Sequence, residues 1–278
     1  MDADKITIET IKSWGYLSTL KYQEFNSATT LSLNQPQWPA CLDQFDQMSM
    51  NTHGAKIIRS IEIASMVPTI DNDSRILDFG CGEGYLTSVM RRFGKKIIGY
   101  DKVEYESWTK CFDKKHLYND LSSIDANKPF KLIIGFDTID HMSLEELLAA
   151  FTFFRKVLHD NGYIYLRCHP FSSRHGRHLL YNKSFIHLVL NSGELKMNNI
   201  DIGNDIKVIK PLNFYDDFFK LVSFKVKSKL IHNSIVEDFV VSNLLEKIKI
   251  NHYNLHDDYE TIKANMAVDF IDYLLSPN

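Results

Sequence analysis

Cysteine is scarce in this sequence, and no stretch is apolar enough to span a membrane. The four cysteines are widely separated and form no C-x-x-C pair; they are Cys41, Cys81, Cys111 and Cys168. Scattered thiols of this kind indicate neither a disulfide framework nor a zinc site, and they are typical of a reducing compartment. No apolar run approaches the roughly 20 residues of a membrane helix, and the acidic first residues are unlike a secretory signal. We therefore expect a cytoplasmic protein with no membrane partner.

An excess of basic residues is also missing. The 32 Lys and Arg residues are outnumbered by 35 Asp and Glu residues, which gives a formal net charge of −3. This balance disfavours a large nucleic-acid-binding surface, although a local basic patch remains compatible with it. Apolar residues make up 44% of the 278 residues, which is enough to bury a substantial core in a single α/β domain.

Glycine is sparse as well, with 12 residues in the chain, yet three glycines stand at alternate positions after one short apolar run. Residues 76–84 read ILDFGCGEG, and a helical pattern begins at Tyr85. This order predicts a strand, a tight turn and a helix start, and a glycine backbone lets a ligand approach closely. Dinucleotide-binding turns read G-x-G-x-x-G, so the two-residue spacing of Gly82 and Gly84 argues against an NAD-dependent oxidoreductase.

Strands and helices alternate around and after this turn. Helices are expected at 85–93 and 143–158, and the second opens with a capping box from Ser143 to Glu146. Such alternation predicts an α/β fold with a doubly wound, mostly parallel sheet that helices cover on both faces. The expected strands are 75–79, 95–100, 116–119, 131–136 and 163–167, with residues 160–162 as the turn before the last.

Outside this core we expect a helix over residues 51–66, a helix over 214–221, strands over 223–231 and 235–241, and an amphipathic closing helix marked by Tyr259, Ile262, Met266, Phe270 and Leu274. The predicted organisation is a single domain over residues 1–278. It has a helical N-terminal cap or lid at 1–68, a core at 69–241 with an insertion at 170–212, and a helical extension at 242–278.

Acidic residues stand at the ends of the predicted strands, which is where open α/β sheets bind their ligands. Asp78 comes two residues before the first glycine of the turn, Asp101 follows the second strand and Asp120 follows the third. In this order, with this glycine spacing, the sequence resembles class I S-adenosylmethionine-dependent methyltransferases over about residues 70–168.

The resemblance implies a seven-stranded sheet and S-adenosyl-L-methionine as cofactor. In that family the glycine loop wraps the methionine part of the cofactor and the nearby acid orients it. An acid after the second strand binds the ribose diol, and one after the third accepts from the adenine amino group. The implied cofactor-binding residues are Asp78, Gly80, Cys81, Gly82, Gly84, Asp101, Asp120, Leu121 and Phe136. Taken singly, each acid is also explained as a turn former, because Asp is common at strand ends.

Two histidines are candidate catalytic bases. Methyl transfer from a sulfonium is an in-line displacement, and a hydroxyl or protonated amine acceptor must also lose a proton. His141 follows the fourth predicted strand and His169 follows the fifth, and imidazole titrates near neutral pH. The structural alternative is that His141 caps the turn before the next helix and that His169 merely precedes a proline turn.

The acceptor itself is less well defined by the sequence. The basic stretch at 171–178 suits either an anionic group on the substrate or a solvated loop. No metal is expected, because the histidines at 169, 175 and 178 have no familiar ligand spacing; a divalent ion shared by Asp137, Asp140 and His169 is a weaker alternative.

The predicted function is methyl transfer to an oxygen or nitrogen atom of a small-molecule or nucleotide-like acceptor. Residues 136–139 read FDTI. They therefore lack both the Asn/Asp-Pro-Pro-Tyr/Phe motif of amino-methylating nucleic-acid enzymes and the Pro-Cys motif of cytosine-C5 enzymes. An RNA-modifying methyltransferase and a non-catalytic binding module that retains the cofactor fold stay open as alternatives. The sequence predicts no oligomeric state.

Overall fold

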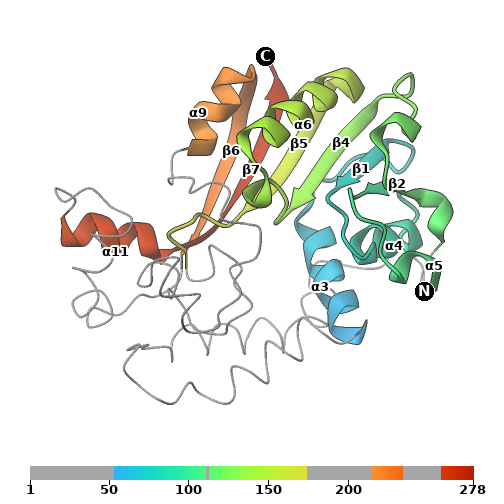
Figure 1. Cartoon of the computed structure of the whole chain (residues 1–278), viewed down its shortest axis with the longest axis horizontal. Helices are drawn as coiled ribbons and strands as arrows, with labels where there is room; N and C mark the ends of the chain where they lie inside the picture. Colours follow the sequence, from blue (N-terminus) through green and yellow to red (C-terminus); the bar gives the residue numbers. More distant parts are fainter. Residues whose placement is uncertain (1–52, 111–112, 174–213, 234–257) are drawn as a thin grey trace.

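The computed structural model describes residues 53–110, 113–173, 214–233 and 258–278, which form one seven-stranded sheet with helices on both faces (Figure 1). The strand order is β3-β2-β1-β4-β5-β7-β6. The strands are β1 (Arg75–Phe79), β2 (Lys96–Tyr100), β3 (Leu117–Tyr118), β4 (Phe130–Phe136), β5 (Leu158–Cys168), β6 (Phe224–Asn233) and β7 (Val268–Pro277).

The α-helices within these residues are α3 (His53–Met66), α4 (Tyr85–Arg92), α5 (Ser107–Lys110), α6 (Leu144–Val157), α9 (Phe214–Leu221) and α11 (Tyr259–Ala267). Three short 3₁₀ turns join them: η2 (Lys114–His116), η3 (Leu121–Ser123) and η4 (Ile139–His141). None of the helices in these ranges is both long enough and apolar enough to cross a membrane.

The sheet is mostly parallel and doubly wound, as predicted. β1 pairs in parallel with β2 on one side and with β4 on the other, so the winding direction reverses between β1 and β4. β7 is antiparallel to both of its neighbours, β5 and β6. In a sheet of this kind a ligand binds beyond the carboxyl ends of the strands at the reversal point, and the glycine turn leaves β1 at that point.

Both faces of the sheet are buried because successive side chains of the strands point to opposite sides. On one face Leu77 of β1 lies in the core that β4, β5 and β7 build with Phe151 of α6 and Phe219 of α9. On the other face Ile76 packs with Leu86 and Met90 of α4 and with the apolar side of α3. This second layer holds α4, and hence the turn before it, against the end of β1.

The predicted elements of the core are confirmed, with small shifts at their ends. β1 and α9 match their expected bounds, and α4 ends one residue early. The capping box of α6 is complete. The backbone N–H of Glu146 donates to the Ser143 hydroxyl at 3.2 Å, and the backbone N–H of Ser143 donates to the Glu146 carboxylate at 2.8 Å.

The predicted closing helix is wrong in its second half. The helix ends at Ala267, and Phe270 and Leu274 lie on β7 instead. Alternate residues of this segment, Ile271, Tyr273 and Leu275, are fully buried, which is strand periodicity. Because β5 and β6 pair with it on both sides, backbone hydrogen bonding in the sheet overrides the helical pattern.

Two further boundaries differ from the prediction. β5 begins at Leu158, so the expected turn at 160–162 lies within the strand, next to a register shift between Phe130 and Leu132 of β4. The last strand of the sheet comes from residues 268–277, beyond the predicted core boundary at 241. The predicted strand at 235–241, most of the N-terminal cap and residues 174–212 of the predicted insertion lie outside the described residues.

Candidate functional site

The glycine turn after β1 has a backbone that only glycine adopts readily. Gly80, Gly82 and Gly84 have φ angles of 80°, 50° and 84°, all in the left-handed region. A Cβ atom on Gly80 would lie 2.2 Å from the Thr138 side chain, so the turn touches the segment that follows β4. The backbone N–H groups of Gly80 and Cys81 both donate to the Tyr100 carbonyl, at 2.7 and 2.9 Å, which ties the turn to the end of β2.

Asp101 holds the centre of this turn. Its Oδ2 accepts from the backbone N–H of Gly82 at 2.9 Å, and its Oδ1 accepts from the N–H of Val103 at 3.0 Å. The Gly82 carbonyl accepts from the Trp108 indole N–H at 2.8 Å. The turn is therefore fixed on both sides before any ligand arrives. Among the described residues, no atom apart from its chain neighbours lies within 4 Å of the position that a Cβ on Gly82 would take, which leaves room for a ligand against the backbone.

Asp78 is buried beneath the turn. The Thr87 hydroxyl of α4 donates to its Oδ2 at 2.7 Å, and the residue is 3% exposed. The pKa of this carboxyl is raised to about 7, chiefly by burial; the Thr87 hydrogen bond opposes the shift and the Asp101 carboxylate adds to it. A cationic group at this position would favour the ionised form, so the site suits a positively charged ligand.

Cys81 is in the turn, but its thiol is a packing group. Its Sγ lies 2.8 Å from the position of a Cβ on Gly99, so it fills the space beside β2. Burial, followed by the Asp78 and Asp101 carboxylates, raises the pKa of the thiol far above its ordinary value. A thiol that stays protonated is a poor nucleophile.

Asp120 lies at the end of β3, on the same side as Asp101. After burial, which is the largest effect, both carboxylates raise the pKa of the Tyr100 phenol, so they lie around a common residue. Asp120 also caps the turn η3: its Oδ1 accepts from the backbone N–H of Ser122 at 2.9 Å. Asp120 therefore acts as a turn former, which was the structural alternative, and its contact with adenine stays a prediction.

Leu121 and Phe136 border the two apolar layers. Leu121 is half-buried against the α6 side of the core. Phe136, at the end of β4, packs on the α3 and α4 side, and its ring lies 5.6 Å from that of Tyr165. Leu121 begins η3, just after β3, and Phe136 ends β4, so both lie near the carboxyl ends of strands. Their contacts with the cofactor stay predictions.

His169 and Asp137 form a pair at the ends of β5 and β4. The His169 Nε2 lies 3.1 Å from the Asp137 Oδ1, and the histidine side chain is 13% exposed. Asp137 has a φ of 52°, which is strained for a residue with a Cβ, and its N–H donates to the Arg167 carbonyl at 3.1 Å. Asp137 directly precedes Thr138, whose side chain lies against Gly80. The pair therefore lies beside the glycine turn.

His141 takes a different position from His169. It is the last residue of η4, and its backbone N–H donates to the Thr138 carbonyl at 3.3 Å. Asp140, the residue before His141, accepts through its Oδ2 from the backbone N–H of His169 at 3.4 Å. In the described part of the chain no three His, Cys, Asp or Glu side chains are grouped so as to hold a metal ion.

Helix α3 contacts both parts of the site. Its Lys56 pairs with Glu83 of the glycine turn at 2.5 Å, and the His53 imidazole lies 2.9 Å from the Tyr85 hydroxyl at the start of α4. Its Arg59 lies 3.5 Å from the Asp137 Oδ2, on the other oxygen from His169. The sequence predicted this helix but gave no signal for these contacts.

A buried ion pair beside the site was also missed. Arg167 of β5 donates through two nitrogens to both carboxylate oxygens of Asp272 on β7, each at 2.7 Å. The guanidinium lies between two rings, 5.4 Å from the Phe136 centroid and 3.9 Å from that of Phe270. His232 of β6 also lies 3.0 Å from Asp272. Burial alone would raise the pKa of Asp272, but the hydrogen bonds from Arg167 and His232 lower it below its ordinary value.

Comparison with known proteins identifies the family. A family model described as a methyltransferase domain matches residues 53–197, more than half of the chain, so the chain belongs to this family. It is a class I methyltransferase, an enzyme that takes its methyl group from S-adenosyl-L-methionine. No curated protein sequence matches the chain.

Solved methyltransferase structures have a similar arrangement at low identity. An S-adenosylmethionine-dependent methyltransferase from Archaeoglobus fulgidus is 13% identical with a TM-score of 0.49, over 84% of this chain and 98% of the other. One from Mesorhizobium loti is 11% identical with a TM-score of 0.46, over 78% and 97%. A TehB-like one from Corynebacterium glutamicum is 13% identical with a TM-score of 0.42, over 87% and 100%. Because every TM-score is below 0.5, family membership rests on the domain match.

Proposed function

We propose that this enzyme methylates an oxygen or nitrogen atom of a small-molecule or nucleotide-like acceptor, and that His169 takes up the acceptor's proton. The observation that carries the proposal is the Asp137–His169 pair at 3.1 Å, next to the segment that touches the glycine turn. A base in this position suits an acceptor that has to lose a proton, such as a hydroxyl or a protonated amine.

We assign the roles of the two imidazole nitrogens from the position of Asp137. The Asp137 Oδ1 lies 3.1 Å from Nε2, and a carboxylate beside this nitrogen suits the tautomer that carries its proton there. The lone pair then belongs to Nδ1, which is the atom that receives the proton. Arg59 lies 3.5 Å from the other oxygen of Asp137 and places a positive charge beside that carboxylate.

The reaction follows from this arrangement. When bound, the cofactor supplies a methyl group on a positively charged sulfur. The acceptor atom forms a bond to the methyl carbon as the carbon–sulfur bond breaks, and His169 receives the proton that the acceptor loses. Asp78 beneath the turn and Asp101 at its centre hold the binding side of the site. Positioning and proton removal are the contributions that this chain makes.

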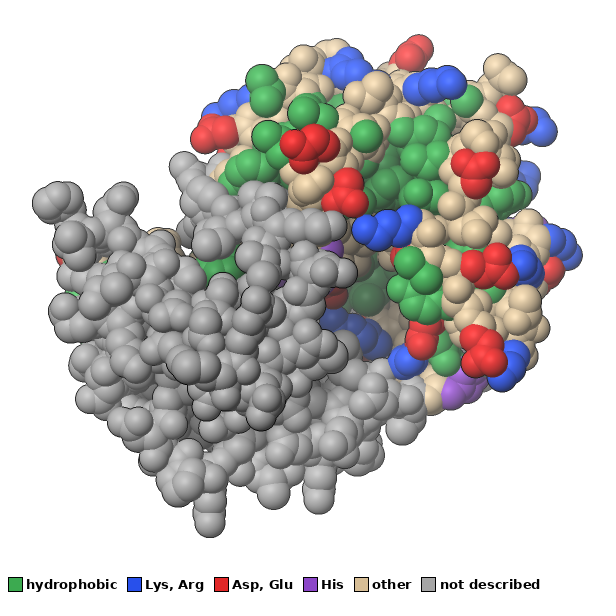
Figure 2. Space-filling model, viewed as in Figure 1, with side chains coloured by type: hydrophobic (Ala, Val, Ile, Leu, Met, Phe, Trp, Pro, Cys, Tyr) green, Lys and Arg blue, Asp and Glu red, His purple; other side chains and the backbone are tan. Residues whose placement is uncertain are grey.

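A small acceptor is favoured over a nucleic acid by the distribution of charge. The chain carries a net charge of −3, and in Figure 2 acidic and basic side chains are interspersed over the described part of the visible face. A nucleic-acid-binding surface needs a continuous basic track.

The first test is cofactor binding. S-adenosylhomocysteine should bind the wild-type chain, and Asp101→Asn should weaken this binding because the turn loses a charge-assisted hydrogen bond. Failure of the wild-type chain to bind at millimolar ligand would contradict the proposal, because the proposed methyl transfer requires the cofactor to bind.

The second test addresses the base. Radiolabelled S-adenosylmethionine is offered with pools of hydroxylated, amino and nucleotide compounds, and with RNA as a separate arm. On the acceptor that is labelled, His169→Gln should lower kcat by about 10² to 10⁴ and leave S-adenosylhomocysteine affinity unchanged. His141→Gln is the matched control. Equal kcat for His169→Gln and wild type would remove the base from the mechanism, and labelling of RNA alone would favour the nucleic-acid alternative.

A further inference from the structure

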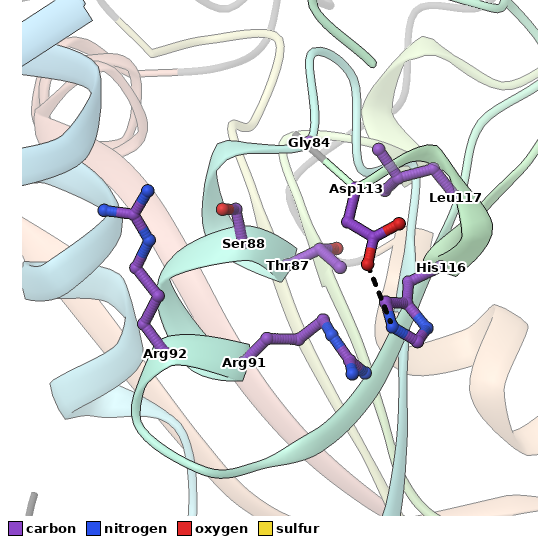
Figure 3. Close-up of a pocket in the computed structure, with 8 residues that line it drawn as sticks. All are labelled: Gly84, Thr87, Ser88, Arg91, Arg92, Asp113, His116 and Leu117. Atoms are coloured by element: carbon purple, nitrogen blue, oxygen red, sulfur yellow. Dashed lines mark ion pairs between the residues drawn. The ribbon is translucent and has the colours of Figure 1, made fainter. Parts of the chain in front are cut away.

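Among the described residues, the connection from β2 to β3 leaves one flank of α4 uncovered. It contains α5, a single turn of four residues, where crossovers between parallel strands usually carry a full helix. A pocket of about 300 Å³ lies in this place, between α4 and the segment that leads into β3. Figure 3 shows its two walls: Arg91 on the helix points toward His116 on the facing segment, and Arg92 points from the helix to the other side.

The pocket is electropositive in an acidic protein. Arg91 and Arg92 come from the last turn of α4, and His116 stands opposite Arg91. Asp113 is the acidic residue of the lining, and its carboxylate is already engaged, at 2.6 Å by Lys115 and at 3.7 Å by His116. Arg92 forms no ion pair with any described residue. The positive charge of the arginines is therefore available to a ligand.

The pocket is also partly organised in advance. One guanidinium nitrogen of Arg91 donates to the Ile97 carbonyl of β2 at 2.9 Å, which fixes the side chain and leaves its other N–H groups for a ligand. Burial, and then the charge of Arg91, lower the pKa of His116, so an anion between these two groups would relieve their repulsion. Ser88 adds a hydroxyl, and Leu117 adds an apolar surface.

We propose that this pocket binds a small organic phosphate between Arg91 and His116, with Arg92 adding positive charge to the lining. A phosphate monoester carries close to two negative charges and three acceptor oxygens, which match donors that approach from two walls. The volume is at the lower end of small-ligand pockets and exceeds that of inorganic phosphate, so an organic part has room beside Leu117.

The pocket has one residue in common with the predicted cofactor contacts and otherwise lies behind them. It shares Gly84 with the glycine turn, and Thr87, which lines it, donates to Asp78 on its other side. The proposal does not depend on the identity of the methyl acceptor, because binding is measured without turnover.

The test is a calorimetric titration of the full chain, saturated with S-adenosylhomocysteine so that the cofactor turn is occupied. Phenyl phosphate is the probe, phenol is the uncharged control, and a short single-stranded RNA is a third arm. The variant Arg91→Gln with Arg92→Gln should bind phenyl phosphate at least tenfold more weakly than wild type. The matched control is Lys225→Gln with Lys227→Gln, which removes the same charge from exposed positions on β6, at the opposite edge of the sheet.

Binding of phenyl phosphate by wild type and by the lysine variant, with loss in the arginine variant, supports the proposal. Equal losses in both variants would show nonspecific charge attraction and overturn it, as would no binding by wild type at millimolar probe. RNA binding that depends on the two arginines while phenyl phosphate does not bind would also overturn it. If the arginine variant fails to fold, the ring signals of His116 in the NMR spectrum of the wild-type chain give the answer. They should shift with phenyl phosphate, and unchanged signals refute the site.

Discussion

Replacing Asp78 with asparagine tests whether a buried carboxyl beneath the glycine turn is held largely protonated. The side chain is 3% exposed and accepts a hydrogen bond from Thr87 at 2.7 Å. An amide oxygen can accept the same bond, so the substitution removes the charge and keeps the shape. In the cofactor-free chain Asp78→Asn should therefore be stabilising at alkaline pH.

The magnitude follows from the pKa. Burial raises the pKa of Asp78 from 3.8 to about 7, and each unit is worth about 1.4 kcal/mol, so the shift corresponds to at most about 4 kcal/mol. Between about pH 4 and pH 7 the folded chain holds a proton that the unfolded chain has released. The contribution of this group to the free energy of unfolding therefore falls as the pH rises through this window, and the full loss is reached above about pH 7.

The assay is urea unfolding of wild type and variant, without cofactor, at about pH 5 and about pH 8. The advantage of Asp78→Asn should grow by about 2 to 3 kcal/mol between these two conditions. Comparing the two proteins cancels the other carboxyl groups, which titrate alike in both. A difference that is the same at both pH values would refute the assignment of a raised pKa to Asp78.

The same substitution should weaken the cofactor site. The ionised carboxylate attracts the ammonium group on the amino-acid part of the cofactor, so wild-type affinity for S-adenosylhomocysteine should rise as the pH passes about 7. Asp78→Asn should bind more weakly and lack this rise. A variant that gains stability and loses affinity would show that the Asp78 carboxylate lowers the stability of the free protein and strengthens ligand binding.

Two further substitutions test the frame around the site. Arg167→Met should cost about 3 to 5 kcal/mol in urea unfolding because it leaves Asp272 charged and buried, whereas the double variant with Asp272→Leu should recover most of that loss; an equal loss in both would contradict the buried-charge explanation. Gly80→Ala should abolish S-adenosylhomocysteine binding, since its Cβ would lie 2.2 Å from a side chain after β4. Gly94→Ala is the control: the residue has a similar positive φ, but no described atom would lie within 4 Å of its Cβ. It should cost about 1 kcal/mol of stability and leave binding intact.

Much of the fold was predictable because local signals agree with the final structure. The bounds of β1 follow from a short apolar run that ends in glycines, and α6 follows from its capping box and apolar stripe. β7 was missed for a physical reason. Its sequence has apolar residues at spacings that serve both a helix and a strand, and only the pairing with β5 and β6 decides between them.

The residues predicted for the cofactor side lie close together along the chain, at the ends of successive strands, so the sequence indicated that they are neighbours. Their contacts with the cofactor stay predictions. Asp101 reaches Gly82 across 19 positions, and the glycine spacing marks the turn itself. What the sequence did not reveal is that Asp101 shapes the turn directly through the Gly82 N–H, in addition to any contact with a ribose. The structure gives this acid a role in the free protein as well.

The acceptor side depends on contacts between distant segments. The sequence grouped His169 with Asp137 only as weak candidate ligands of a divalent ion. Their direct pairing depends on the register of β4 and β5, with Phe136 opposite Arg167. Asp137 also adopts a strained φ of 52°, which the sequence does not encode in any recognisable way. A strained residue persists where its surroundings hold it, and here Arg59, His169 and the Arg167 carbonyl all do so. Because Arg59 belongs to α3 and the Arg167 side chain is locked to β7, the geometry of the proposed base depends on both ends of the domain.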